Sequence, residues 1–287
     1  MSRHTVSDLF ERYLTHLERR RRAPSTIRCY RSAYARAKPR LGAIPADRID
    51  LADLCELHED WHETPVLADR TISYISAALT HAERLGWRPI GSNPCKLIER
   101  YAPKPELVPV DRETLVKILD AVDDLVAAEE IDLVSATCFR LLVFTGARLK
   151  EILTAKWSFL DLEEAVLHLP KAKRGARDVA LPDEALAVLA HLPRLGPYIC
   201  PGRDPRKPRV EVRRAWAKVV RRVGCRGLRR HDLRHGFATA LHEANVPLAQ
   251  IGELLGHRDP RTTNRYAHPR VGRLRGEISA VLRRRSA

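Results

Sequence analysis

Six positions in the second half of the chain carry side chains that together suit the handling of a phosphodiester without a metal. They supply two guanidiniums, an amine, two imidazoles and a phenol, at Arg148, at Lys171 or Lys173, and at His231, Arg234, His257 and Tyr266. A scissile phosphate gains negative charge in its transition state, and two arginines can each hold it through paired N–H donors. Fixed donors aimed at such charge contribute on the order of 3 kcal/mol each. The set therefore predicts chemistry on a phosphate ester.

The remaining groups of the set can complete a transfer reaction. A phenol can attack the phosphate and release its proton to a nearby base or into the positive site. A lysine in the polar turn at 171–176, which lies between two short apolar runs, can protonate the leaving 5′ oxygen. A phosphotyrosyl ester conserves the energy of the broken bond, so rejoining the strand needs no ATP. Each residue type is common alone, and only the combination favours this chemistry.

The charge balance indicates a polyanionic partner. The chain carries 51 Lys and Arg residues against 36 Asp and Glu residues, which gives a formal charge of +15 and an isoelectric point near 10.0. The first basic cluster covers residues 18–28, and the second covers residues 203–234, which hold 13 basic and three acidic residues. Binding to nucleic acid is favoured because it displaces counterions from phosphates. A membrane is the weaker alternative, because no basic segment also has a strong apolar face.

The overall composition predicts a folded protein with two domains or one large domain. Hydrophobic residues make up 44% of the chain, no run approaches the ~18 apolar residues of a membrane span, and the N-terminus lacks the apolar core of a signal peptide. We therefore expect a cytoplasmic, nucleoid-associated protein. Its scattered cysteines form no CxxC pair, which predicts buried free thiols. These cysteines are Cys29, Cys55, Cys95, Cys138, Cys200 and Cys225.

Amphipathic periodicity predicts a small all-α domain over residues 1–101. About four short helices are expected there. One should begin after a capping box formed by Thr5 and Asp8, and another should begin at Pro24. Three closely spaced prolines then disfavour helix, so residues 102–110 are expected to link two domains.

Residues 111–287 are predicted to form a mostly helical domain with one small β-sheet, so the whole fold is expected to be mainly α. Two β-type runs flank the turn at 171–176 and predict a hairpin. Asp183 is expected to cap the helix that follows, and Asn245 to adopt a left-handed conformation after a later helix. Helical patterns lie at about 111–126, 131–144, 183–192, 210–223, 229–244 and 247–257.

Three motifs make the sequence resemble the tyrosine recombinases of the phage-integrase family. They are TGARLKEIL, HDLRHGFAT and LLGHRDPRTTNRYAH, which run over about 120 residues in the family's order and spacing. The basic helical N-terminal domain resembles the core-DNA-binding half of the family. The resemblance implies a site-specific recombinase that cleaves and rejoins DNA through a 3′-phosphotyrosine intermediate, for integration, excision or resolution. It also implies activity without a metal, ATP or another cofactor.

The resemblance assigns a role to each position of the motifs. Tyr266 becomes the nucleophile that takes the 3′ phosphate. Arg148 and Arg234 become the clamp that holds this phosphate. His231 is implied as a base or hydrogen-bond partner, and His257 as a second donor to the phosphate.

The family's lysine lies on the β-hairpin, where this chain offers two candidates. Lys173 is favoured because the family's lysine usually lies this close before the second strand, and Lys171 stays open as the alternative. Glu151, one helical turn after Arg148, is expected to support the site rather than react. Contacts to DNA are expected from basic residues of the two clusters and the hairpin: Arg19, Arg20, Arg21, Arg22, Arg28, Lys171, Arg174, Arg213, Arg214, Arg229 and Arg230.

The resemblance also implies how the protein assembles on double-stranded DNA. Two protomers would bind each inverted-repeat core site, and four would form the synapse. The free protein is expected to be a monomer. Accessory DNA-bending or directionality factors are further expected partners, whereas a membrane is not.

Other interpretations compete with this one. His231 and His235 stand four residues apart with Asp232 between them, as in the HExxH zinc hydrolases. Asp232 is one methylene shorter than the glutamate such a base requires, and a hydrolase would leave Arg148 and Tyr266 without a role. A DNA-binding protein of the same fold without strand transfer is a second alternative, although all the reactive residue types are present. A type IB topoisomerase would share the chemistry, but the two-domain size favours recombination.

Overall fold

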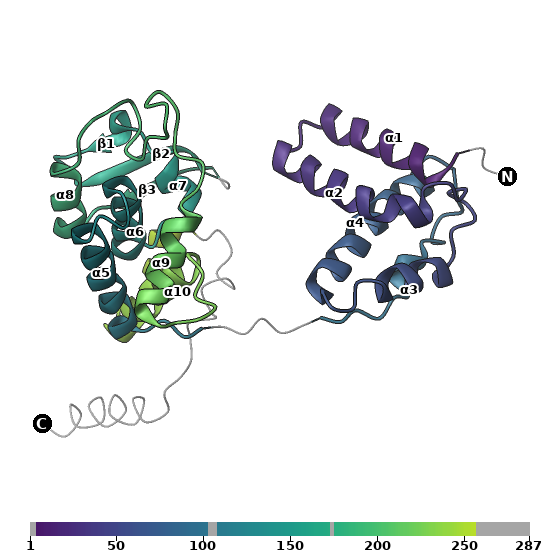
Figure 1. The fold of residues 1–287 in the computed structure, drawn as a ribbon. Coiled ribbons are helices and arrows are strands. Elements are labelled where there is room, and N and C mark those ends of the chain that lie inside the picture. The colour runs from purple at the N-terminus through teal and green to yellow at the C-terminus, as the bar shows by residue number, and fades with distance from the viewer. Residues whose placement is uncertain (1–3, 103–107, 173–174, 257–287) are drawn as a thin grey trace, which may run out of the picture. The chain divides into compact units, whose positions relative to one another are not determined.

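The chain consists of two compact units, Met1–Glu106 and Leu107–Ala287. The computed structural model describes residues 4–102, 108–172 and 175–256. Both units are built mainly of α-helices, and the β-sheet of the described residues belongs to the second unit (Figure 1). The mainly α fold with one small sheet is thus confirmed. The boundary between the units falls inside the predicted linker.

The first unit is a helical domain with one core. Its described elements are α1 (Val6–Arg19), α2 (Pro24–Leu41), α3 (Leu51–Glu59), α4 (Pro65–Arg84) and the 3-10 turn η1 (Pro94–Lys96). α1 packs against α2 and α4, and α4 also contacts α2 and α3. Apolar stripes of these helices meet in the core, where Phe10, Ile75 and Leu79 have no exposed surface.

Local sequence signals explain where these helices begin. The predicted capping box is present, because Asp8 N donates to Thr5 Oγ1 at 3.2 Å and Thr5 N donates to Asp8 Oδ2 at 2.7 Å. α2 begins at Pro24 as predicted. α3 begins with a second capping box, formed by Asp50 and Asp53. The sequence pattern does not locate this helix, since nine residues give only a short apolar pattern.

The second unit surrounds a central helix with further helices and the sheet (Figure 1). Its described helical elements are α5 (Arg112–Ala127), α6 (Leu133–Thr145), α7 (Leu149–Leu153), η2 (Trp157–Phe159), α8 (Asp183–Ala190), α9 (Arg213–Val223), α10 (Asp232–Glu243) and α11 (Leu248–Leu255). Its strands are β1 (Leu160–Asp161), β2 (Val166–Ala172) and β3 (Gly175–Ala180). The central helix is α6, which contacts α5, α7, α8 and α10. The positions of the long helices agree with the sequence prediction to within a few residues.

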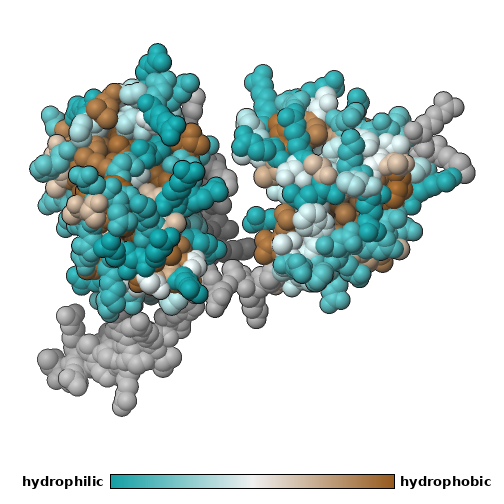
Figure 2. All heavy atoms as spheres, in the orientation of Figure 1, coloured by the Kyte–Doolittle hydropathy of each residue, from teal (hydrophilic) through white to brown (hydrophobic). Residues whose placement is uncertain are grey.

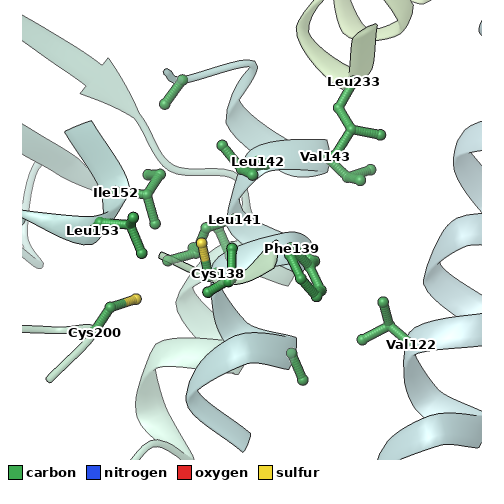
Figure 3. Packing of buried hydrophobic residues seen from close by; sticks show 14 of the residues in the cluster. Val122, Cys138, Phe139, Leu141, Leu142, Val143, Ile152, Leu153, Cys200 and Leu233 are labelled. Atoms are coloured by element: carbon green, nitrogen blue, oxygen red, sulfur yellow. The ribbon is translucent and has the colours of Figure 1, made fainter. Parts of the chain in front are cut away.

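α6 is mostly apolar, as a helix with most of its surface buried must be, and Arg140 is its partly exposed charged residue. Figure 3 shows Cys138, Phe139 and Leu142 pointing from this helix to different sides of the core. The ring of Phe139 meets the ring of Trp216 in α9 edge-on, with 5.2 Å between centroids. This packing fixes the C-terminal end of α6, from which the candidate site is built.

The cysteines are all free, but they are not all buried. Cys95, Cys138 and Cys200 are buried, and burial raises the pKa of Cys95 to about 12. A hydrogen bond between Cys138 and Cys200, together with burial, raises the pKa of Cys138 well above its ordinary value (Figure 3). The prediction of buried thiols is wrong for Cys29, which faces solvent from α2. It also fails for Cys55 and Cys225, which are partly exposed.

The sheet is antiparallel in the order β1-β2-β3. β2 and β3 form the predicted hairpin, in which Leu167 pairs with Val179 and Leu169 pairs with Arg177. Directly opposite residues share one face of an antiparallel pair, and Leu167 and Val179 are both buried. Arg177 therefore lies on the buried face of the sheet. The sequence does not predict β1, because two residues carry no readable alternation.

Two predicted helix-terminal residues had different outcomes. Asn245 has φ of +68° directly after the end of α10, so its left-handed conformation is confirmed. The prediction for Asp183 is wrong, because Pro182 occupies the N-cap position and Asp183 is the first residue of α8. The proline ring fixes φ at −67° and its backbone is already extended, which moves the helix start by one residue.

On the face seen in Figure 2, hydrophilic residues cover most of each unit, with smaller apolar patches among them. Large apolar side chains are exposed in both units, for example Ile90 and Val210. Within the described residues, no helix combines the length and the apolar character that crossing a membrane requires.

Candidate active site

Arg148 follows the left-handed turn that ends α6. Gly146 closes that helix with φ of +59°, and its N–H donates to Leu142 O at 3.1 Å. Arg148 precedes α7, where its backbone N–H donates to Glu151 Oε2 and its Nη1 donates to Glu151 Oε1, both at 2.8 Å. Glu151 is buried, whereas the side chain of Arg148 retains 22% exposure. A buried carboxylate thus orients a guanidinium that still reaches the surface, which fits the supporting role expected for Glu151.

Arg177 of β3 is a second partner of Glu151, and it lies outside the predicted set. Its Nη2 donates to Glu151 Oε2 at 2.7 Å, and its Nε donates to Oε1 at 3.4 Å. Burial alone would raise the pKa of Glu151, but the hydrogen bonds from Arg177 and Arg148 outweigh it and lower the pKa. Strand alternation could have revealed this residue, because Arg177 lies two positions before the buried Val179 and shares its face.

Arg234 lies on α10 and is 3% exposed. Its Nη1 donates to Gly146 O at 2.9 Å, and its Nη2 donates to Leu255 O. This guanidinium therefore joins the end of α6 to the end of α11. Gly146 cannot carry a side chain here, because its φ is positive and a Cβ would lie 2.4 Å from Cδ1 of Phe237.

His231 stands directly before α10 with an exposed side chain. Its ring meets the ring of His235 edge-on, with 5.2 Å between centroids. Partial desolvation of the ring lowers the pKa of His231, and the positive charges of Arg234 and Arg148 lower it further. Arg234 follows His231 by one helical turn, and its bond to Gly146 O brings it to the segment that leads to Arg148. The structure thus gathers two arginines and one histidine of the predicted set at the end of α6.

Asp232 has a structural partner that bears on the zinc alternative. Its side chain is 2% exposed and accepts from Arg229 N at 2.8 Å and from Arg229 Nη2 at 2.9 Å. The carboxylate therefore stabilises the turn into α10. Among the described residues, no three His, Cys, Asp or Glu side chains are placed to hold a metal ion. Nothing in this part of the chain favours a zinc hydrolase.

The structure describes the backbone of only one of the two candidate lysines. The backbone of Lys171 belongs to β2. Lys173 and Arg174 lie outside the described residues, between the last residue of β2 and the first of β3. The preference for Lys173 over Lys171 therefore stays a prediction.

His257 and Tyr266 also lie outside the described residues. The structure reaches Gly256, which ends α11 in a left-handed conformation with φ of +63°. His257 is the next residue in the sequence. The end of α11, where Arg234 is bonded, is thus the last described point before these two candidates.

The first basic cluster is exposed to solvent. It begins at the last residue of α1, passes through Arg21 with φ of +50°, and continues on α2. Near it, Arg31 of α2 pairs with Glu18 at 2.9 Å. The predicted DNA contacts in this cluster, all exposed, are Arg19, Arg20, Arg21, Arg22 and Arg28.

The second basic cluster is partly neutralised by acidic neighbours. Arg213 and Arg214 are exposed in the first turn of α9, whereas Arg230 is partly buried. The predicted contact Arg229 is engaged with Asp232. The ion-paired members of the cluster among the described residues are Arg206, Arg209, Arg213, Lys218, Arg222 and Arg229. Its charge toward a partner is therefore lower than the sequence count implies.

Comparison with known proteins points to one family. The family model described as the phage integrase family matches residues 110–273. The tyrosine recombinase XerC of Alcanivorax borkumensis is 27% identical over 285 residues, which cover 92% of this chain and 90% of that protein. The tyrosine recombinase XerA of Thermococcus onnurineus is 27% identical over 280 residues, which cover 94% of each chain.

Solved structures share the fold. An integrase of the transposon Tn1549, in complex with transposon right end DNA, matches with a TM-score of 0.76 at 17% identity. That match covers 97% of this chain and 100% of the other. A lambda integrase (75–356) dimer bound to a COC′ core site matches with a TM-score of 0.70 at 20% identity, covering 90% of this chain and 96% of the other.

Proposed function

Because the chain belongs to the phage integrase family, we propose that it is a site-specific DNA recombinase that cuts and rejoins strands through a bond between Tyr266 and a 3′ phosphate. The observation that carries this proposal is the meeting of Arg148, His231 and Arg234 at the end of α6. These residues come from two motifs that lie far apart in the sequence. Their convergence creates a positive, partly exposed site that suits a phosphate.

The two arginines bind the scissile phosphate. Arg148 keeps part of its side chain exposed while Glu151 fixes the orientation of its guanidinium. Arg234 is held by carbonyl groups at Gly146 and Leu255, so its position is set before DNA binds. Donors fixed in advance stabilise the charge that develops on the phosphate and cost little reorganisation.

The remaining residues transfer the strand. The phenolic oxygen of Tyr266 forms a bond to phosphorus, the bond from phosphorus to the 5′ oxygen breaks, and Lys173, or alternatively Lys171, protonates that oxygen. His231 accepts the phenolic proton or acts as its hydrogen-bond partner. Partial burial and the neighbouring guanidiniums lower its pKa, which favours the neutral imidazole that can accept a proton. His257 donates to the phosphate. Attack by the 5′ hydroxyl reverses these steps, so rejoining needs no ATP. We propose that the reaction also requires no metal.

We further propose an assembly like those named for the lambda integrase, which is described as a dimer on a core site and as a tetramer on a Holliday junction. Two protomers of this chain would bind one inverted-repeat site, and four would form the synapse. The exposed arginines of the first cluster would contact DNA phosphates. The protein would act on DNA in the cytoplasm, in the nucleoid.

A comparison of wild type with Tyr266→Phe tests the proposal. The DNA site is first selected from a library of random duplexes with the Tyr266→Phe protein, which should bind without cutting. A nick is then placed near the cleavage point so that the released fragment cannot return. Wild type should form an adduct that survives denaturant, and Tyr266→Phe should form none.

A matched control is Tyr198→Phe, because Tyr198 is a half-buried tyrosine of the same unit beside Lys156. This variant should form the adduct at the wild-type rate. An adduct in Tyr266→Phe would contradict the assignment of the nucleophile. Specific DNA binding without an adduct in wild type would favour the alternative of a binding protein without strand transfer.

A further inference from the structure

We propose that Arg177 is a positioning residue that couples Arg148 of the phosphate clamp to the end of α11, the segment directly before His257. This role rests on the proposed function, because it concerns how the recombination site is held together. Arg177 would act through Glu151 and through the backbone of α11.

The side chain of Arg177 spans two parts of the site at once. It is 10% exposed, and two of its nitrogens donate to the carboxylate of Glu151. Its third nitrogen, Nη1, donates to Leu254 O at 2.8 Å. A planar guanidinium can hold a carboxylate and a carbonyl simultaneously, whereas a lysine carries only a single charged point. One residue of β3 thus bridges the support of Arg148 and the last turn of α11.

Glu151 is shared between two arginines in a way that uses its whole carboxylate. Each oxygen accepts two hydrogen bonds: Oε1 from Arg148 Nη1 and Arg177 Nε, and Oε2 from Arg148 N and Arg177 Nη2. A carboxylate offers about four lone-pair directions, so these four bonds fill it. Loss of Arg177 would free half of the carboxylate and leave it buried with one counter-ion. Glu151 could then tilt, and Arg148 with it.

The end of α11 depends on arginines from other elements. The last carbonyls of a helix lack partners within the helix. At α11, Leu254 O is bonded to Arg177 of β3, and Leu255 O is bonded to Arg234 of α10. Positive groups are also favoured at a helix C-terminus by the helix dipole. Two guanidiniums therefore fix the turn from which the chain continues to His257.

Gly256 shows how closely Arg177 approaches that turn. A Cβ at Gly256 would lie 2.7 Å from Cδ of Arg177, and φ at this glycine is +63°. The backbone of the turn therefore rests directly on the stem of the arginine. Movement of Arg177 would change the packing of the residue that precedes His257 in the sequence.

Arg177→Gln tests this coupling against a matched control, Arg140→Gln. Arg140 of α6 also pairs with an acid of a neighbouring helix, through Nη2 and Asp123 Oδ1 at 2.5 Å, and its side chain is 18% exposed. In single-turnover cleavage of the nicked site, Arg177→Gln should be slower by about 100-fold, the loss that a small misplacement of catalytic groups can cause. Its DNA affinity should change little, and Arg140→Gln should cleave at the wild-type rate.

The pH profile separates positioning from a loss of stability. Without Arg177, Glu151 loses a hydrogen-bond partner and a positive charge that lower its pKa, so the pKa should rise. A protonated Glu151 holds Arg148 less firmly, so the acid limb of the cleavage rate should move to higher pH. Adding Glu151→Gln to Arg177→Gln removes the titrating group and should abolish this shift. A slower Arg177→Gln with an unchanged pH profile would overturn the proposal.

Hydrogen exchange tests the coupling without any reaction. Backbone amides at 252–256 should exchange faster in Arg177→Gln, and those in Arg140→Gln should exchange as in wild type. Unchanged exchange at the end of α11 would overturn the proposal even if cleavage were slow. If wild type itself formed no adduct, the proposed function would fall, and the exchange measurement would still decide whether Arg177 holds this turn.

Discussion

Arg177 and Arg234 in the second unit and the run Arg19–Arg22 in the first unit all carry a guanidinium group. The two sets differ in how far they are exposed to solvent and in how firmly they are held. Arg234 is 3% exposed and the side chain of Arg177 is 10% exposed, and both are bonded to fixed protein groups. The arginines of the run are exposed at and just after the end of α1. One group is held in place before any ligand arrives, whereas the other can move.

This difference separates catalysis from affinity. A fixed guanidinium can stabilise charge in a transition state without reorganising, so its loss should lower the rate of reaction. An exposed guanidinium attracts a polyanion over a distance that salt limits to about 10 Å, so its loss should lower affinity in a salt-dependent way. Net charge alone cannot tell these uses apart, because both groups count equally toward it.

The largest effect is expected for Arg234→Lys. Arg234 uses two separate nitrogens of a planar group for Gly146 O and Leu255 O, and a lysine, with one nitrogen, lacks this geometry for holding both carbonyls and a phosphate. Cleavage of the nicked site should fall by about 10²- to 10³-fold, as for the loss of one fixed oxyanion donor. Specific DNA binding in a gel-shift assay should persist. Arg140→Lys is the control, and near-wild-type cleavage by Arg234→Lys would break the comparison.

An intermediate effect is expected when the exposed run is neutralised by changing Arg19, Arg20, Arg21 and Arg22 to Gln together. The slope of log affinity against log salt should become less steep by about 0.9 for each DNA phosphate that the variant no longer neutralises. Cleavage at saturating protein and the melting temperature should both stay near wild type, because these side chains are exposed. An unchanged salt slope would remove the run from the DNA interface.

The smallest effect is expected for Asn245→Gly, at an exposed residue with φ of +68°. Glycine removes the small strain of this conformation but adds freedom to the unfolded chain, so the two effects oppose each other. The free energy of unfolding should change by less than about 1 kcal/mol, with no change in cleavage. Denaturant unfolding measures this difference. A large loss of activity would show that the α10–α11 turn takes part in the site.

Helix caps, left-handed residues and hairpins can be predicted from the sequence because each depends on a few neighbouring residues. The capping box of Thr5 and Asp8 and the left-handed Asn245 depend on a few neighbouring residues, and both are present. The hairpin was readable because alternation and a polar turn coincide. The motifs that contain Arg148, His231 and Arg234 lie near one another at the end of α6, and the roles assigned to these residues stay predictions.

The support of the site was harder to predict because it depends on partners distant in the sequence. Arg177 bonds to Leu254, which lies 77 residues away, and nothing near Arg177 identifies that carbonyl. The acidic partners of the second basic cluster come partly from α5 and the segment after it, so the charge count overstated its free charge. The helix α8 has Pro182 as its N-cap, one residue before the predicted Asp183. A pattern of polar and apolar residues does not fix the first residue of a helix to within one position.

The most direct test of the account is the chemical identity of the protein–DNA bond. The adduct formed by wild type on the nicked site is digested with trypsin and a nuclease, and the nucleotide-bearing peptide is identified by mass spectrometry. The account predicts the peptide 266–270, with Tyr266 joined to a 3′ phosphate and a free 5′ hydroxyl on the departing strand. A bond at any other residue, or to a 5′ phosphate, would contradict it.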